Sequence, residues 1–115
     1  MFLTRISSTV SGRSAREARR SYAPDGRVIA EFSLAVGQGS VKYPTMWVKV
    51  CVWEGLAEKA LAVIDRKGLN IEASGFLVVT QYEGKHGKSL LIELKDVREL
   101  KMFDRDGNLE RVLDM

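Results

Sequence analysis

The residues with the clearest chemistry lie in one apolar segment, Met46–Trp53, which carries two tryptophans and a lysine at alternate positions. The segment is rich in β-branched and aromatic residues, so it is predicted to be a strand whose side chains alternate between two faces. One face is then apolar, and the other bears Trp47, Lys49, Cys51 and Trp53. Flat indole rings offer surfaces on which bases stack, and an ammonium group between them can meet a phosphate. The same composition also fits a strand buried on both sides, with both indoles in the core.

A second group of residues suited to a polyanion is an arginine-rich segment near the N-terminus. Residues 13–27 carry five arginines and two acidic residues, and they hold the whole net charge of +3, because the rest of the chain is neutral. Arginine pairs with phosphate groups and stacks on bases, which favours a contact with nucleic acid. A solvated, mobile loop is the alternative interpretation. The five basic residues are Arg13, Arg16, Arg19, Arg20 and Arg27.

Catalytic and metal-binding chemistry has little support elsewhere in the sequence. His86 and Cys51, the only histidine and the only cysteine, lie in different predicted elements, so no nucleophile has an evident base and no metal ligands cluster. Residues 104–108 contain two aspartates, but their spacing fits a turn better than a calcium loop. No glycine-rich phosphate-binding motif is present. We therefore expect no enzyme activity, no catalytic residue, no metal and no cofactor.

The size and composition of the chain predict one globular domain. At 115 residues, with 45% hydrophobic and 29% charged residues, the chain has enough apolar side chains for a single modest core. No apolar run approaches the roughly 20 residues needed to span a membrane. The N-terminus lacks the pattern of a secretory signal, and a lone cysteine cannot form an internal disulfide. These features predict a cytoplasmic protein without membrane contact.

Hydrophobic periodicity predicts five strands and one helix. The expected strands cover residues 2–11, 27–36, 46–53, 69–81 and 89–100, and the helix covers residues 55–67. This order is typical of an all-β fold, a five-stranded OB-fold Greek-key barrel with one α-helix between strands 3 and 4. In such a barrel the apolar row of the third strand faces inward, which turns Trp47 and Trp53 outward. Residues 1–104 are expected to form this domain, and residues 105–115 a short C-terminal tail.

Smaller features of the sequence lead to further expectations. Residues 13–21 are predicted to be a connection that is either helical or extended. Gly68 is expected to cap the helix at its C-terminus, and Gly75 to mark a bulge or a sharp coil in the fourth strand. Residues 83–88 contain two glycines and are predicted to form a hairpin loop.

Several short motifs, in their order and spacing, resemble the bacterial single-stranded DNA-binding protein family, from about Gly12 to Asp104. The matching pieces are Tyr22-Ala23-Pro24-Asp25-Gly26, residues 30–36, Trp47 to Trp53 followed by Leu56-Ala57-Glu58, Lys67-Gly68, Gly75, Tyr82 and Glu93. The resemblance implies base stacking on Trp47, Trp53 and Tyr82, and a homo-oligomer, a tetramer before a dimer. It is a resemblance to a tail-less form, because no Gly/Pro/Gln-rich tail with an acidic tip is present. Recruitment of other proteins through such a tail is therefore not expected.

Together these observations predict a protein that binds single-stranded DNA without strong sequence preference and protects it in DNA replication, repair and recombination. Phosphate contacts are assigned to Arg13, Arg16, Arg19, Arg20, Lys49, Lys85 and Lys88. Two alternatives remain open. One is a primosomal replication-restart protein of the same fold, which is usually dimeric. The other is an OB module whose aromatic face binds a protein. Outward apolar residues at Ile29, Phe76 and Val78 favour a homo-oligomer.

Overall fold

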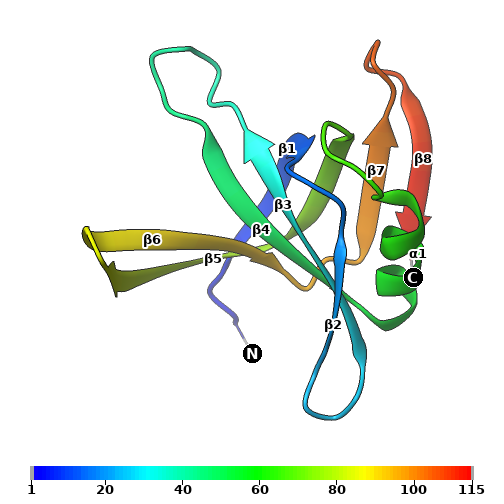
Figure 1. Ribbon diagram of the computed structural model, residues 1–115, viewed down its shortest axis with the longest axis horizontal. Coiled ribbons are helices and arrows are strands. Elements are labelled where there is room, and N and C mark those ends of the chain that lie inside the picture. Colours follow the sequence, from blue (N-terminus) through cyan, green and yellow to red (C-terminus); the bar gives the residue numbers. More distant parts are fainter. Residues whose placement is uncertain (1, 115) are drawn as a thin grey trace.

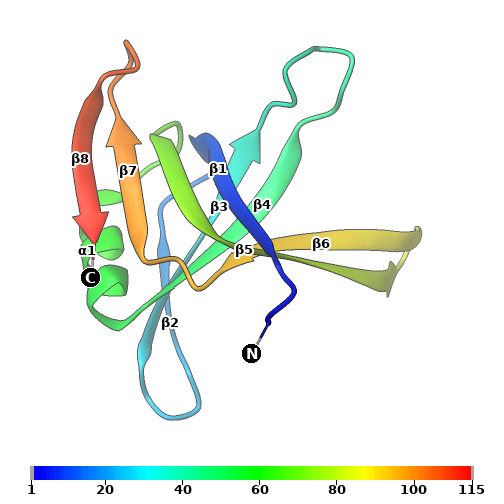
Figure 2. The same cartoon turned by 180° about the vertical axis from the view of Figure 1, so that it is seen from behind.

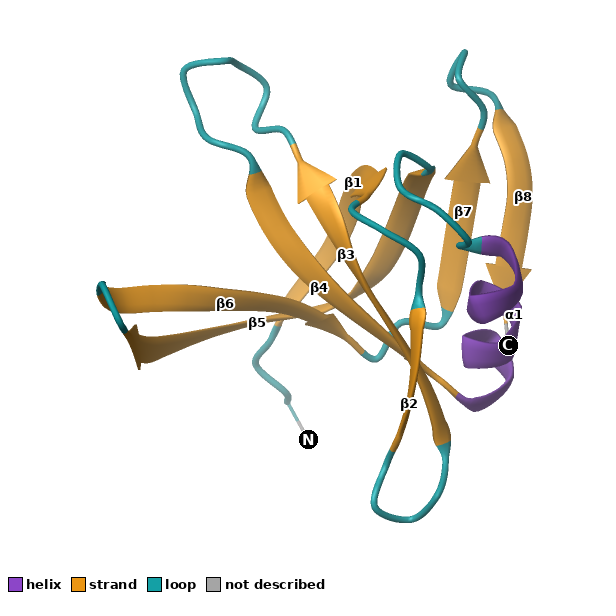
Figure 3. Cartoon of the chain, viewed as in Figure 1, coloured by secondary structure: helices purple, strands orange, loops and turns teal. Residues whose placement is uncertain are grey.

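The computed structural model describes residues 2–114, which form eight strands and one helix (Figure 1). The helix lies beside the last strand, and one long hairpin projects from the opposite side of the molecule (Figure 3). In chain order the elements are β1 (Ile6–Ser14), β2 (Arg19–Tyr22), β3 (Val28–Val36), β4 (Met46–Trp53), α1 (Glu54–Val63), β5 (Asn70–Gly84), β6 (Gly87–Lys95), β7 (Glu99–Phe103) and β8 (Leu109–Asp114).

Five strands close into a ring, which confirms the predicted OB-fold barrel with its helix between the third and fourth predicted strands. β1 pairs with β3, β3 with β4, β4 with β6 and β6 with β5, and β5 returns to β1. These pairings are antiparallel except β4–β6, which is parallel with Val48 opposite Ile92. β2 pairs with β3 outside the ring. β7 and β8 extend the sheet from β5, as the view from behind shows (Figure 2).

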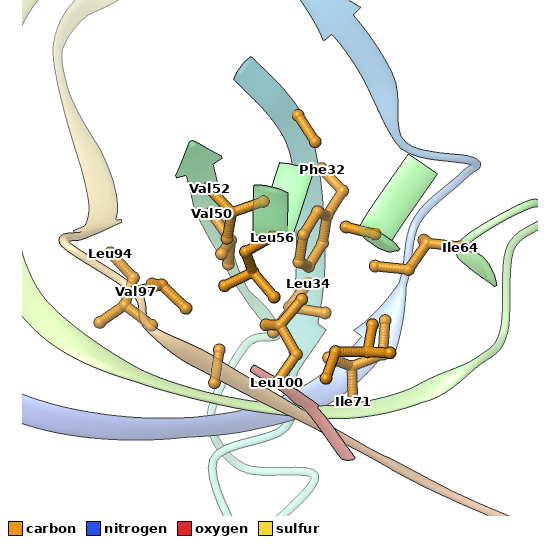
Figure 4. Packing of buried hydrophobic residues seen from close by; sticks show 14 of the residues in the cluster. Phe32, Leu34, Val50, Val52, Leu56, Ile64, Ile71, Leu94, Val97 and Leu100 are labelled. Atoms are coloured by element: carbon orange, nitrogen blue, oxygen red, sulfur yellow. The ribbon is translucent and has the colours of Figure 1, made fainter. Parts of the chain in front are cut away.

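The core lies inside the ring and follows from the alternation of side chains along β3 and β4. In the middle of these strands every second residue is buried, and α1 adds the face that carries Leu56, Ala57 and Ala60. Figure 4 shows Leu56 among the side chains of the core. Burying one large apolar side chain stabilises a fold by about 1.5–3 kcal/mol. The largest fully buried side chains are Leu34, Leu56, Ile64, Ile71, Leu94, Leu100, Val50 and Val52.

Two glycines allow strands of the ring to approach each other closely. A Cβ atom at Gly75 would lie 2.4 Å from the carbonyl oxygen of Lys95, and one at Gly12 would lie 2.6 Å from that of Ala35. Neither distance is compatible with a side chain unless the backbone moves. β5 continues through Gly75 as a strand in unbroken register with β1, so Gly75 marks no bulge and instead allows a close contact with β6. The sharp coil stays a prediction. Gly12 lies inside β1, which continues to Ser14 beyond the predicted end at residue 11.

The helix is shorter than the predicted range of 55–67 and ends at Val63. Ile64 leaves the helical conformation and is fully buried. The residues that follow bond to β1 instead of extending the helix. Ser14, which is buried, donates its hydroxyl to the carbonyl of Arg66 at 2.8 Å, and its own carbonyl accepts from the N–H of Gly68 at 2.8 Å. Gly68, with φ of 87°, therefore forms part of a turn after the helix and is not the C-cap of the helix.

One further segment takes one of its two predicted forms, and another differs from the sequence-based expectation. The connection over residues 13–21, predicted to be either helical or extended, contains the end of β1 and the short strand β2, so it is largely extended. The strand predicted over residues 89–100 is two strands, β6 and β7. The break between them contains Asp96, whose φ of 54° turns the chain away from β6 so that β7 pairs with the first part of β5.

The segment predicted as a short tail contains β8, which pairs with β7. Leu113 of β8 is buried, and the ammonium of Lys59 on α1 donates to the carbonyl of Asp114 at 2.7 Å. Residues 109–114 are therefore packed onto the sheet and the helix. The division into a domain over 1–104 and a separate tail over 105–115 stays a prediction, and Met1 and Met115 lie outside the described residues.

Candidate nucleic-acid interface

The outer face of β4 carries both tryptophans, as the alternation along the strand predicts. Trp47 is 60% exposed and Trp53 is 36% exposed, whereas Val48, Val50 and Val52 between them are buried. The indoles therefore lie outside the core, and the alternative of a strand buried on both sides is wrong. A side chain as large as tryptophan is rarely left in water without a ligand or a partner.

A depression of about 500 Å³ lies beside Trp47 and collects basic side chains from two strands and a loop. The pairing of β2 with β3 places Arg19 next to Glu31, and the pairing of β3 with β4 places Ser33 next to Lys49. Three cations face two carboxylates there, so the depression favours an anion. The residues that line it are Ala15, Arg16, Glu17, Arg19, Glu31, Phe32, Ser33, Trp47 and Lys49.

Glu31 positions Lys49 in this depression and keeps it charged. The ammonium nitrogen of Lys49 lies 3.4 Å from Oε2 of Glu31, and the hydroxyl of Ser21 donates to Oε1 at 3.2 Å. Partial burial lowers the pKa of Lys49, but the attraction of Glu31 and neighbouring groups outweighs it, so the pKa is raised. Lys49 is therefore available to a phosphate as a cation at neutral pH.

Cys51 lies between the two tryptophans and is not a reactive group in this arrangement. Burial and then the negative charge of Glu31 raise the pKa of its thiol, so the thiol stays protonated at neutral pH. Cys51 is therefore a small strand residue and not a nucleophile.

Trp53 has different surroundings from Trp47. The guanidinium of Arg27 lies over its ring at 4.7 Å from the centroid. A smaller hollow of about 360 Å³ beside it is lined by Arg27, Trp53, Glu54, Asp96, Val97 and Arg98. The sequence indicated Arg27 only as a member of the arginine-rich segment. Its contact with Trp53 depends on the pairing of β3 with β4, which sets Ile29 beside Trp53.

Tyr82 lies on the β5–β6 arm, which is defined here as residues 78–91 and projects from the ring (Figure 1). Tyr82 is 51% exposed and pairs with Ser89, on the same face as Val78. Val78 in turn pairs with Glu93, which pairs with Lys49, so Tyr82 shares the outer face with β4. Lys85 lies in the turn of the arm. Lys88 pairs with Glu83 and so lies on the opposite face from Tyr82.

The other predicted phosphate contacts are placed unequally. Arg13 pairs with Ala35, which pairs with Trp47, so Arg13 lies on the outer face two strands from that indole. Arg20 pairs with Ala30 and faces α1, where its Nη1 and Nη2 donate to Glu58 at 2.7 and 2.9 Å. This bidentate pair raises the pKa of Arg20 and lowers that of Glu58. The structure therefore brings Arg16, Arg19 and Lys49 to Trp47 and does not bring Arg20 there.

The described residues contain neither a metal-binding cluster nor a membrane-spanning helix. Among residues 2–114 there is no group of three or more His, Cys, Asp or Glu side chains arranged to hold a metal ion. No helix in the described part of the chain has the length and apolar character needed to cross a membrane.

Comparison with known families shows which family the chain belongs to. The sequence model described as "Single-strand binding protein family" matches residues 7–100. The chain belongs to the single-strand binding protein family. The matched range spans the ring except for Ile6 at the start of β1, and it includes Trp47, Trp53 and Tyr82. Single-stranded DNA binding is the general function of this non-catalytic family. A search of curated proteins gave no match.

Proposed function

We propose that this member of the family binds single-stranded DNA without strong sequence preference. The observation that carries the proposal is the exposed indole of Trp47 beside a depression lined by Arg16, Arg19 and Lys49. Stacking on an indole accepts every base, because every base has a flat face, and the cations follow the phosphates. Trp53 and Tyr82 supply further stacking surfaces along the outer face. Arg13 and Lys85 extend the phosphate contacts beyond the depression, and Lys88 is a proposed contact on the opposite face of the arm.

The cellular role we propose is protection of exposed strands in DNA replication, repair and recombination, in the cytoplasm. Sequence-tolerant binding suits this role, because the strands exposed in these processes differ in sequence. The lone cysteine supports a reducing compartment. A primosomal replication-restart protein is the nearest alternative, and the mass of the assembly in solution separates the two.

The salt dependence of binding tests the phosphate contacts. Replacing Arg16 and Arg19 together with alanine should weaken oligo-dT binding and reduce the slope of log K against log salt by about 1.4, or about 0.7 for each lost contact. Titrations at several salt concentrations measure this slope. Arg20→Ala is the matched comparison and should change the slope less, because Glu58 holds that guanidinium. An unchanged slope in the double variant would mean that this segment does not touch the strand.

We also propose a homo-oligomer, a tetramer before a dimer. Support comes from apolar side chains that a monomer would leave in water, which include Val78 at the base of the arm and Val79, Leu90 and Leu91 further along it. Ile29 and Phe76 are partly exposed, and the guanidinium of Arg5 covers the ring of Phe76 at 4.2 Å from its centroid.

Light scattering after size exclusion measures the assembly. The expected mass is four times the chain mass of 12.9 kDa. In a closed symmetric oligomer several stacking faces can bind the same DNA strand, and this raises the effective concentration of each face. A monomer mass at micromolar concentration would overturn the proposal, and a clean dimer would favour the primosomal alternative.

A further inference from the structure

The two tryptophans of β4 differ in what covers their rings. Trp47 is open and faces the depression described above, whereas the guanidinium of Arg27 lies over the ring of Trp53 at 4.7 Å. Trp53 is correspondingly the less exposed of the two. A base that approaches Trp53 from the side of Arg27 therefore meets a guanidinium before it meets an indole.

Arg27 is fixed in this position by the turn that precedes β3. Asp25 accepts from Nε of Arg27 at 2.8 Å and from the backbone N–H of Arg27 at 3.1 Å, and Glu54 lies 3.9 Å from the same Nε. The hydrogen bonds from Arg27 lower the pKa of Asp25, so this anchor stays ionised at neutral pH. Within residues 2–114 no hydrogen bond uses the Nη atoms of Arg27, and about half of its side chain is exposed.

Arg27 also affects the balance of charge around Trp53. Three carboxylates lie near this indole, those of Asp25, Glu54 and Asp96, and the cations are Arg27 and Arg98. Without Arg27 a single arginine would face all three carboxylates, and the excess of negative charge that a phosphate meets would rise from one to two. Trp47 has the opposite balance, with more cations than carboxylates.

We propose that a nucleobase stacks on the outer face of the Arg27 guanidinium, which itself rests on Trp53. The site is thus a three-layer stack of base, guanidinium and indole, with Asp25 as the positioning residue for the middle layer. Guanidinium planes stack on bases, and the indole below supports the cation. This inference rests on the proposed binding of single-stranded DNA, and it adds Arg27 to the residues that contact the strand.

Arg27→Lys is the most informative variant, because it keeps the charge and removes the plane. We expect oligo-dT affinity to fall at least about fivefold, the lower end of what one lost stack costs, with the salt slope unchanged. Arg27→Ala should weaken binding further and also flatten the slope, because it removes the cation. Arg105→Lys, in the exposed turn between β7 and β8 and far from the β2–β3 turn (Figure 1), is the matched control and should bind like wild type.

The outcomes separate this inference from the proposed function. If wild type binds oligo-dT and Arg27→Lys binds equally well, the three-layer stack is wrong and the proposed function stands. If Arg27→Ala binds more tightly than wild type, Arg27 masks Trp53, which also overturns the inference. If wild type does not bind oligo-dT at all, both proposals fail. Circular dichroism confirms that each variant is folded, which the exposed position of both arginine side chains leads us to expect.

Discussion

Trp47→Ala should weaken the binding of oligo-dT by about 1–3 kcal/mol, the usual cost of losing one base–aromatic stack. Trp47 is the more exposed of the two indoles, and Arg16, Arg19 and Lys49 lie beside it. Its ring adds little to the core, because the buried row of β4 is on the other side of the strand. Isothermal titration with a fixed length of oligo-dT measures the change in affinity.

The control for Trp47→Ala is a measurement of its folding and stability. Circular dichroism and urea unfolding should show a folded Trp47→Ala protein close to wild type. An unfolded variant would mean that the indole stabilises the barrel, and the loss of binding would then say nothing about stacking. A folded variant with unchanged affinity would remove Trp47 from the interface.

Leu34→Ala should lower the free energy of unfolding by about 2–5 kcal/mol, because it opens a cavity in a packed core. Leu34 has no exposed surface and lies on the inner face of β3 among the side chains shown in Figure 4. Urea unfolding followed by circular dichroism measures the effect. Molecules that remain folded should still bind oligo-dT, because the outer face is not altered.

Leu109→Ala is the matched control for the core variant. The same atoms are removed, but Leu109 is 56% exposed at the start of β8. Surface substitutions of this kind usually change stability by less than about 0.5 kcal/mol. Equal losses in the two variants would contradict the assignment of the core to the interior of the ring.

The strands whose apolar residues alternate were predicted from the sequence with little error. β4 has the predicted bounds, and β3 differs by one residue, because in both strands one face is buried and the periodicity is complete. The elements that were missed depend on partners distant in the chain. β2 exists because it pairs with β3, and β8 because it pairs with β7. Their own residues show no alternation strong enough to predict a strand.

The end of the helix was also set by a distant residue. The residues at helical spacing are Leu56, Ala57, Ala60, Leu61 and Ile64, and all of them are buried except Leu61, which is partly buried. The sequence pattern allowed the helix to continue to residue 67, but hydrogen bonds from Ser14 hold the following backbone in a different conformation. No local pattern around residue 64 contains that information.

The part of the candidate site that lies on one strand could be predicted from the sequence. The part that depends on how neighbouring strands pair could not. Alternation along β4 was sufficient to turn Trp47 and Trp53 outward. The different positions of Arg19 and Arg20 follow from the strand β2, which was not predicted. Neighbouring residues of a strand face opposite sides, so only Arg19 reaches the depression. The contact of Arg27 with Trp53 and the position of Lys88 behind Tyr82 also follow from pairing between strands.

The central claim is that bases stack on the outer face of β4, and tryptophan fluorescence tests it most directly. In Trp53→Phe the only remaining indole is that of Trp47, so its emission reports on the depression alone. We predict a saturable quench when oligo-dT is added, with an affinity that falls as salt is raised. Emission from Trp47 that stays unchanged while oligo-dT is titrated to saturating concentration would contradict stacking and favour a module whose aromatic face binds a protein.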